Sequence, residues 1–452
     1  MYALGPATPL SSHQLSLFLL QLTMLLLLAL CLGRLAALVR LPTVVGELLA
    51  GLVLGPSLLG HLAPGVADWL TPPEPTQLHL LDAVGQLGVL LLVAVTGAHL
   101  DVKMLRRRRW AVGWVSLGGL LVPLGLGVAV AFALPDRLVP ETVDRPVFAF
   151  FLGIALSVSA IPVIAKILGD LNLLHRDVGQ LTIAAAMVND AVAWFLLSIA
   201  SALATVGVQL GLIGRSVLYL LGFAALAVFV LRPAMRWTLR QAARTGEPGA
   251  TVTVVVIFVL GCSWATHALG LEAIFGAFLA GAVIGSPGVT DLRMLAPLRL
   301  VVLAVLAPLF LATAGLRMDL TALADPTVLL AAVAVTLVAV AGKLIGGYLG
   351  ARASRLSHWE GLALGAGLNA RGVVEVIMAY AGLRLGVLNT ASYTVVVLVA
   401  VVTSLMAPPL LRAAMRRVET TADERLRATE HEVWTLPAPG APPPPEPAER
   451  TG

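Results

Sequence analysis

Charged residues are scarce in this chain of 452 residues. Only 12% of its residues are Asp, Glu, Lys or Arg, and 58% are hydrophobic. A soluble globular domain has about 25% charged residues. This composition excludes an ordinary soluble protein and predicts an all-α polytopic membrane protein.

Cysteine is nearly absent as well. The two cysteines, Cys31 and Cys262, both lie inside apolar runs, which excludes a disulfide framework and a CxxC metal motif. The chain has no HExxH or GxSxG motif, and the segment before Lys343 fails as a phosphate loop because Leu337 replaces the first glycine. We therefore expect no enzyme activity and no cofactor. Because the basic residues fall in short loops, we expect no nucleic-acid partner either.

Apolar runs are abundant. A window of about 20 residues predicts about 13 transmembrane helices, centred near residues 26, 51, 90, 122, 157, 190, 220, 258, 277, 306, 339, 371 and 401. Lys and Arg concentrate in alternate loops, which predicts a multi-pass cell-membrane protein with residues 1–14 outside and the C-terminus cytoplasmic. Residues 15–415 would form the transmembrane domain. The charged and proline-rich residues 416–452 would form a disordered cytoplasmic tail.

One carboxylate lies in the middle of a span. Asn189 and Asp190 follow one another in the apolar run from Asp177 to Leu203. Asp190 is about 13 residues from either end, or roughly 20 Å at 1.5 Å per residue. An acid at that depth costs about 2.5 to 3.5 kcal/mol and normally faces a polar cavity or a partner. Asp190 is therefore a candidate ion site, with a structural ion pair as the alternative.

The fifth span contains a proline that should interrupt it. Pro162 has no N–H, so it frees the carbonyl of Val158 from its helical bond. Ser157 and Ser159 flank that carbonyl. Together they predict an oxygen-lined break suited to a hard cation.

The eleventh and twelfth spans carry deep charges. Glycines around Asn369 weaken the twelfth span, where Arg371 precedes Glu375 by four residues, the spacing of a helical ion pair. Lys343, in the eleventh span, lies too deep to reach the interface comfortably. We expect Lys343 either to pair with a carboxylate or to line a water-filled funnel on the cytoplasmic side.

The two interrupted spans have matching positions in two halves of the chain. The halves comprise residues of about 15–205 and 250–413, with a linker helix at about 210–231. Each span of the first half matches the span seven places later in the chain. Because seven is an odd number, the two halves cross the membrane in opposite directions. Inverted repeats with two interrupted helices meeting at the midplane are typical of secondary transporters.

At these residues the chain resembles the monovalent cation:proton antiporter-2 family of Na⁺/H⁺ and K⁺/H⁺ exchangers. The matching motifs are PTVVGELLAGLVLGPSLLG, SVSAIPVIAKIL, the Asn189–Asp190 pair, GLEAIFGAFLAGAVI, TAGLRMDL, and NARGVVEVI through SLMAPPLLR. The resemblance implies a sodium/proton antiporter fold with two crossed discontinuous helices, elevator-like movement and a homodimer.

The resemblance also implies roles for the residues singled out above. Asp190 would carry the monovalent cation, Na⁺ or K⁺, and the proton in turn. Asn189 would be its polar neighbour, Ser157, Val158 and Ser159 would line the crossing, and Lys343, Arg371 and Glu375 would supply supporting charges. Such a protein would serve pH homeostasis in contact with membrane lipid.

Asn189 departs from the pattern of electrogenic relatives, which resemble this chain but carry two adjacent aspartates. Because Asn cannot ionise, we expect one proton per monovalent cation and electroneutral exchange. The anionic partner of Lys343 stays open between Glu375 and Glu272. The alternative functions are a potassium efflux system and a membrane sensor or structural subunit without turnover.

Overall fold

The computed structural model describes residues 11–39, 41–70, 75–98, 109–206, 210–244, 248–286, 289, 292–421 and 424. This part of the chain is nearly all helical. Its principal helices are α1 Ser12–Leu38, α2 Thr43–Leu54, α5 Pro75–Ala98, α7 Arg109–Ala133, α8 Arg145–Ser157, α9 Ile161–Asp170, α10 Asp177–Val206, α11 Leu210–Leu226, α12 Arg232–Arg244, α13 Pro248–Ala268, α14 Ala273–Ile284, α15 Ala296–Val301, α16 Ala307–Leu316, α17 Pro326–Ala353, α18 His358–Leu368, α19 Val373–Arg384 and α20 Thr390–Met415.

Helices lie at 12 of the 13 predicted centres, and the centre near residue 371 falls in the break between α18 and α19. In the described residues, ten helices are long and apolar enough to cross a membrane, and the pair α18 and α19, bent by 49°, makes an eleventh. The predicted fifth span is divided between α8 and α9, and the predicted ninth span is the 12-residue helix α14. The polytopic helical fold is therefore confirmed, with two of the predicted spans shorter than a full crossing.

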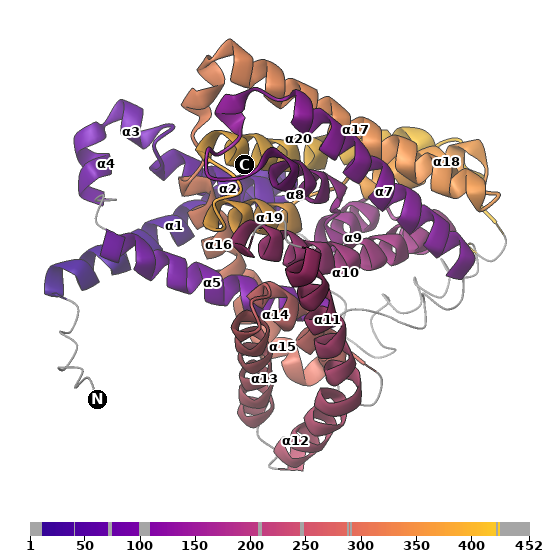
Figure 1. Ribbon diagram of the computed structural model, residues 1–452, viewed down its shortest axis with the longest axis horizontal. Coiled ribbons are helices and arrows are strands. Elements are labelled where there is room, and N and C mark those ends of the chain that lie inside the picture. The colour runs from indigo at the N-terminus through magenta and orange to yellow at the C-terminus, as the bar shows by residue number, and fades with distance from the viewer. Residues whose placement is uncertain are drawn as a thin grey trace, which may run out of the picture.

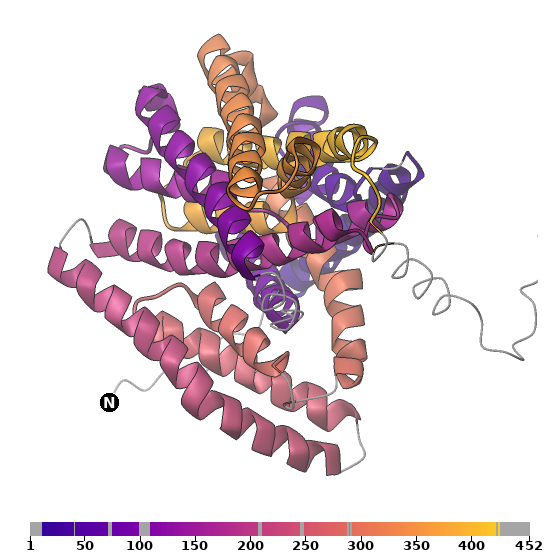
Figure 2. The same ribbon diagram turned by 90° about the vertical axis from the view of Figure 1, so that its right-hand side faces the viewer.

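The helices pack in two groups (Figure 1). One group contains α7, α8, α9, α10, α17, α18, α19 and α20, and the other contains α1, α2, α5, α13, α14 and α16. The groups meet where α10 packs on α14 and where α19 packs on α16. Figure 2 shows the helices around residues 210–268 as a layer beneath the first group. We call the group that contains α10 the core bundle and the group that contains α2 the scaffold bundle.

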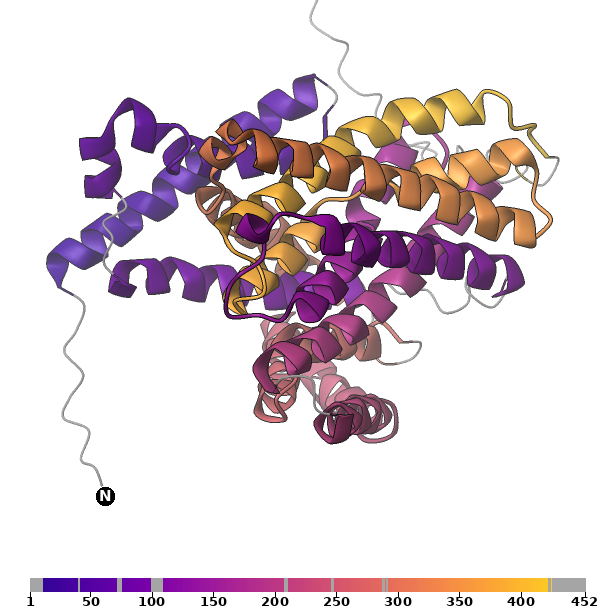
Figure 3. The same ribbon diagram turned by 45° about the horizontal axis from the view of Figure 1, so that its top comes forward.

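Glycines bring α7 and α17 into backbone contact along much of their length (Figure 3). A Cβ atom on Gly346 would lie 2.2 Å from the carbonyl oxygen of Gly118, and one on Gly350 would lie 2.4 Å from that of Trp114. A Cβ on Gly342 would lie 2.8 Å from Pro123. The stripe Gly342, Gly346 and Gly350 is therefore a face of small residues that lets the two helices pack closely.

Candidate functional site

The two interrupted helices meet at their breaks. Residues 158–160 separate α8 from α9, and residues 369–372 separate α18 from α19. The Ala160 N–H donates to the Ala370 carbonyl at 3.1 Å, and the Ser159 hydroxyl donates to the Leu368 carbonyl at 2.8 Å. Two non-helical segments thus bond to each other in the middle of the core bundle.

The break after Ser157 follows from Pro162, which takes a first-turn position in α9 where its missing N–H costs nothing. The last carbonyls of α8 then have no helical donors. Two basic side chains supply them: Lys343 donates to the Ser157 carbonyl, and Arg371 donates to the Leu156 carbonyl at 2.6 Å. Cations at the C-terminal end of a helix are also favoured by its dipole.

Lys343 is fully buried and uses all three of its donors. Besides the Ser157 carbonyl, it donates to the Gly119 carbonyl at 3.0 Å and to the Ser159 hydroxyl at 2.8 Å. The partner that the sequence left open is therefore neither Glu375 nor Glu272. Lys343 instead joins α7, α17 and the break of α8 through oxygen atoms of the main chain and one serine.

Arg371 and Glu375 form the predicted pair one helical turn apart. Their N–O distance is 2.9 Å, and both side chains are fully buried. Arg371 also donates to the Ala339 carbonyl at 3.3 Å, and its own carbonyl accepts from Ser404. Both deep cations of the core bundle are thus engaged with groups other than Asp190.

Asp190 is fully buried at the level of this crossing. Neither of its carboxylate oxygens has a hydrogen-bond partner within the described part of the chain. The side-chain nitrogen and oxygen of Asn189, those of Asn369 and one carboxylate oxygen of Glu375 also have no partner among the described residues. An unpartnered buried carboxylate is costly, so a bound cation or proton would stabilise this arrangement.

Asn189 and Lys343 share a neighbour. The amide nitrogen of Asn189 lies 3.4 Å from the position that a Cβ would take on Gly119, whose carbonyl accepts from Lys343. Asp190 and Lys343 also lie close enough for their charges to interact. The residues predicted from sequence are therefore brought together, although they do not all bond to one another.

Ser157, Val158 and Ser159 are fully buried at the break, but they contribute differently. Ser159 offers its hydroxyl to the crossing. The Ser157 hydroxyl turns back to the Ile154 carbonyl at 2.8 Å, so Ser157 contributes its main-chain oxygen instead. Val158 takes an extended conformation between them.

Sequence reasoning missed several polar residues near the site. Asn369 belongs to a quoted motif but was not singled out, and Ser404 and Trp194 gave no signal, because single polar or aromatic residues in apolar helices are common. Glu47 in α2 did give a signal. It is a carboxylate inside an apolar run, as Asp190 is.

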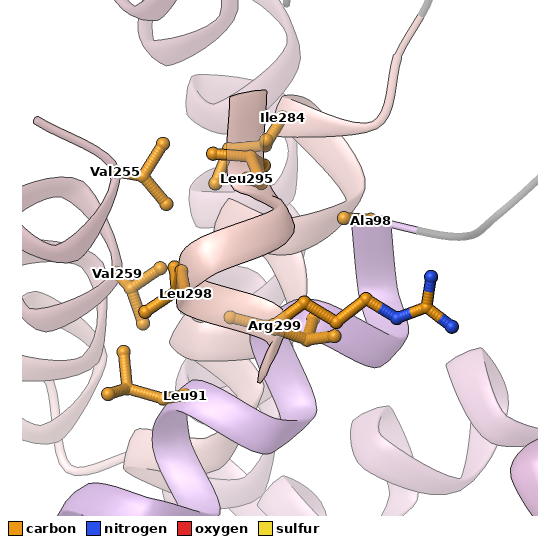
Figure 4. A pocket seen from close by; sticks show the side chains of 10 residues that line it. Leu91, Ala98, Val255, Val259, Ile284, Leu295, Leu298 and Arg299 are labelled. Carbon is orange, nitrogen blue, oxygen red and sulfur yellow. The ribbon is translucent and has the colours of Figure 1, made fainter. Parts of the chain in front are cut away.

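A separate apolar pocket of about 70 Å³ lies between α5, α13, α14 and α15 (Figure 4). Its described lining residues include no acid, and its one charged residue, Arg299, points away from Leu91 and Val259. This pocket offers no ligand for a cation. Over the residues that the structure describes, no group of three or more His, Cys, Asp or Glu side chains could hold a metal ion.

Comparison with known proteins places this geometry in a family. The family described as "Sodium/hydrogen exchanger, transmembrane" matches residues 23–417. The Na⁺/H⁺ antiporter NhaS4 of Synechocystis sp. is 31% identical over 88% of this chain and 97% of its own length. The cation/H⁺ antiporter 15 of Arabidopsis thaliana is 31% identical over 92% of this chain and 50% of its own. This chain spans about half the length of the plant relatives that it matches.

A solved structure shares the fold. The sodium proton antiporter MjNhaP1 from Methanocaldococcus jannaschii aligns with a TM-score of 0.67 at 14% identity, covering 89% of this chain and 99% of that one. The antiporter fold that the family resemblance implies is therefore confirmed. This chain belongs to the transmembrane sodium/hydrogen exchanger family, a family of transporters and not of enzymes.

Proposed function

We propose that this protein exchanges a monovalent cation, Na⁺ or K⁺, for protons across the cell membrane by alternating access. Asp190 carries the cation and the proton in turn. The relatives named as Na⁺/H⁺ and K⁺/H⁺ antiporters support this class of substrate. The free energy for one ion comes from the gradient of the other.

The observation that carries the proposal is the state of the Asp190 carboxylate. It is fully buried at the helix crossing, and neither oxygen has a hydrogen-bond partner among the described residues. The neighbouring cations, Lys343 and Arg371, are already held by carbonyls, a serine and Glu375. A carboxylate in this setting binds a positive ion, and the monovalent cation and the proton compete for it.

The stoichiometry follows from the residue beside it. Asn189 carries no charge in any protonation state, so one carboxylate serves one cation or one proton. We therefore propose electroneutral exchange. The Ser159 hydroxyl and the main-chain oxygens of the break are oxygen atoms at the crossing that could complete the cation's coordination.

The proposal extends to the arrangement in the membrane. Two inverted repeats, at about 15–205 and 250–413, would place the two breaks opposite each other, and the hydrogen bond between Ala160 and Ala370 supports this pairing. The N-terminus would lie outside and the C-terminal tail in the cytoplasm, as the basic loops indicate. The protein would function as a homodimer through its scaffold bundle. Residues 1–10 of the N-terminus and residues 422, 423 and 425–452 of the tail lie outside the described part.

The test is cation-driven proton movement in everted vesicles, followed with a dye that reports the pH gradient. Asp190→Asn should abolish the response to Na⁺ and K⁺, whereas the exposed control Glu141→Gln should keep it. A wild-type rate that is unchanged by a clamped membrane potential is expected for electroneutral exchange. Retained exchange in folded Asp190→Asn protein would refute the carrier role.

A further inference from the structure

Two adjoining cavities lie between the bundles on the side of the basic loops. The outer one has a volume of about 450 Å³ and the inner one about 240 Å³, and Pro42 and Lys166 line both. Each has room for several water molecules. Arg412 of α20 also lines the outer cavity.

The inner cavity reaches the depth of the ion site. Trp194, one helical turn from Asp190, lies in its wall together with Val163 of α9 and Val373, the first residue of α19. The indole nitrogen of Trp194 is buried and has no hydrogen-bond partner in the described part of the chain. A cation from the basic-loop side would cross this cavity before it reached Asp190.

The charges along this route differ between the two cavities. Lys166 and Arg412 line the outer cavity, and Lys166 also borders the inner one, where Glu47 is the one acid among the described residues that line either cavity. Basic groups at the mouth repel an approaching cation, and a carboxylate in a low-dielectric wall offsets that repulsion and raises the local cation concentration.

Glu47 is held on the scaffold bundle. Its helix, α2, packs so closely on α1 that a Cβ on Gly46 would lie 2.2 Å from the Leu32 carbonyl oxygen. The Glu47 carboxylate bonds the Thr43 side chain one turn away and lies beside Gly33 of α1. Thr43 lines the same cavity. The Glu47 carboxylate is thus fixed to a different bundle from Asp190.

We propose that Glu47 forms a second cation site, at which a partly hydrated Na⁺ or K⁺ is bound by the Glu47 carboxylate, the Thr43 hydroxyl and water on its way to Asp190. This inference rests on the proposed exchange function and adds a recruiting residue on one side of the membrane only. Because Glu47 lies outside the core bundle, it raises the cation's occupancy of the cavity without being the group that carries the ion across.

The experiment compares vesicles of the two orientations. In everted vesicles, which present the basic-loop side to the bath, Glu47→Gln should raise the apparent KM for Na⁺ or K⁺ about tenfold and leave the maximal rate near that of the wild type. In right-side-out vesicles the KM should stay unchanged. Glu47→Asp should restore most of the affinity, and high ionic strength should reduce the difference by screening.

Leu49→Gln is the matched control, since Leu49 lies on the same helix and is 43% exposed. An equal rise of KM in both orientations, no rise in either, or complete loss of exchange in folded Glu47→Gln protein would each overturn the proposal. Binding of radioactive sodium or rubidium to purified protein gives an independent readout. Asp190→Asn should keep a binding component that Asp190→Asn/Glu47→Gln lacks, even if the wild type proves unable to exchange ions.

Discussion

Lys343 connects three parts of the core bundle through hydrogen bonds to oxygen atoms. It bonds the Gly119 carbonyl of α7, the Ser157 carbonyl at the end of α8 and the Ser159 hydroxyl in the break. In this structure it forms no ion pair within the described residues, so its contribution is to hold the break in place beside Asp190.

Replacing Lys343 should therefore affect stability in a graded way. Lys343→Met leaves three buried oxygens without a donor, and each lost hydrogen bond to a charged group costs roughly 1.5 to 3 kcal/mol. Lys343→Gln keeps two donors. We expect the melting temperature of the detergent-solubilised protein to decrease from the wild type to Lys343→Gln and again to Lys343→Met. A Lys343→Met variant as stable as the wild type would contradict the proposal that Lys343 holds the break in place.

At the scale of elements, the contact between α7 and α17 depends on the absence of side chains. A Cβ on Gly118 would lie 2.3 Å from the Gly346 carbonyl oxygen, whereas one on Gly125 of the same helix would meet nothing within 4 Å. The two glycines therefore form a matched pair within one helix.

Gly118→Ala should destabilise the protein by about 1 to 3 kcal/mol, because the helices must separate to admit the methyl group. Gly125→Ala should be neutral or slightly stabilising, since alanine favours the helix over glycine. Melting temperatures of the two variants provide the measurement. Equal melting temperatures would mean that α7 and α17 do not pack as closely as described.

A second contact joins Glu424, which follows α20, to the start of the Asp190 helix. Glu424 accepts from the Asp177 N–H at 2.7 Å and lies 3.1 Å from the Arg176 guanidinium. Burial raises the pKa of Glu424, but the backbone donors of Asp177 and Thr421 and the charge of Arg176 outweigh it. The pKa of Glu424 is therefore lowered from its usual 4.5.

A lowered folded-state pKa stabilises the protein above the unfolded value, and this contribution is lost as the pH falls through the folded value. Glu424→Gln should therefore lower the melting temperature at pH 7. The gap between wild type and variant should narrow as the pH falls below 4.5 and through the lowered pKa of Glu424. A gap that stays constant across that range would show that the charge of Glu424 does not stabilise the contact.

At the scale of the whole molecule, the two ends of the interface between the bundles differ. The cavities lie at the end with the basic loops. At the other end, Asp82 of the scaffold bundle pairs with Arg317 and accepts from Tyr380 of the core bundle at 3.3 Å. Arg384 pairs with Glu272 there as well. The structure is therefore open toward one side and closed by polar contacts on the other.

Asp82→Ala should weaken that closed side, because Arg317 loses its partner and Tyr380 loses its acceptor. We expect a cysteine in place of Thr394, a buried residue of α20 whose hydroxyl accepts from the Asp319 N–H at 3.0 Å, to react several-fold faster with an impermeant maleimide applied on the side opposite the basic loops. The background carries serine at positions 31 and 262. Asp136→Ala, which removes an exposed pair with Arg145, is the control. Unchanged labelling in Asp82→Ala would argue against a closing role for Asp82.

The sequence alone was enough to establish the membrane class, most helix positions and the place of Asp190 in the middle of its helix, because hydrophobic runs and buried charges obey rules that act locally along the chain. Pro162 and the glycines around Asn369 likewise predicted the two breaks. The partners of Lys343 and the cavity beside Glu47 were decided only by the tertiary structure. A lysine satisfied by main-chain oxygens leaves no trace in residue types, and a cavity exists only once two bundles, distant in sequence, face each other across it.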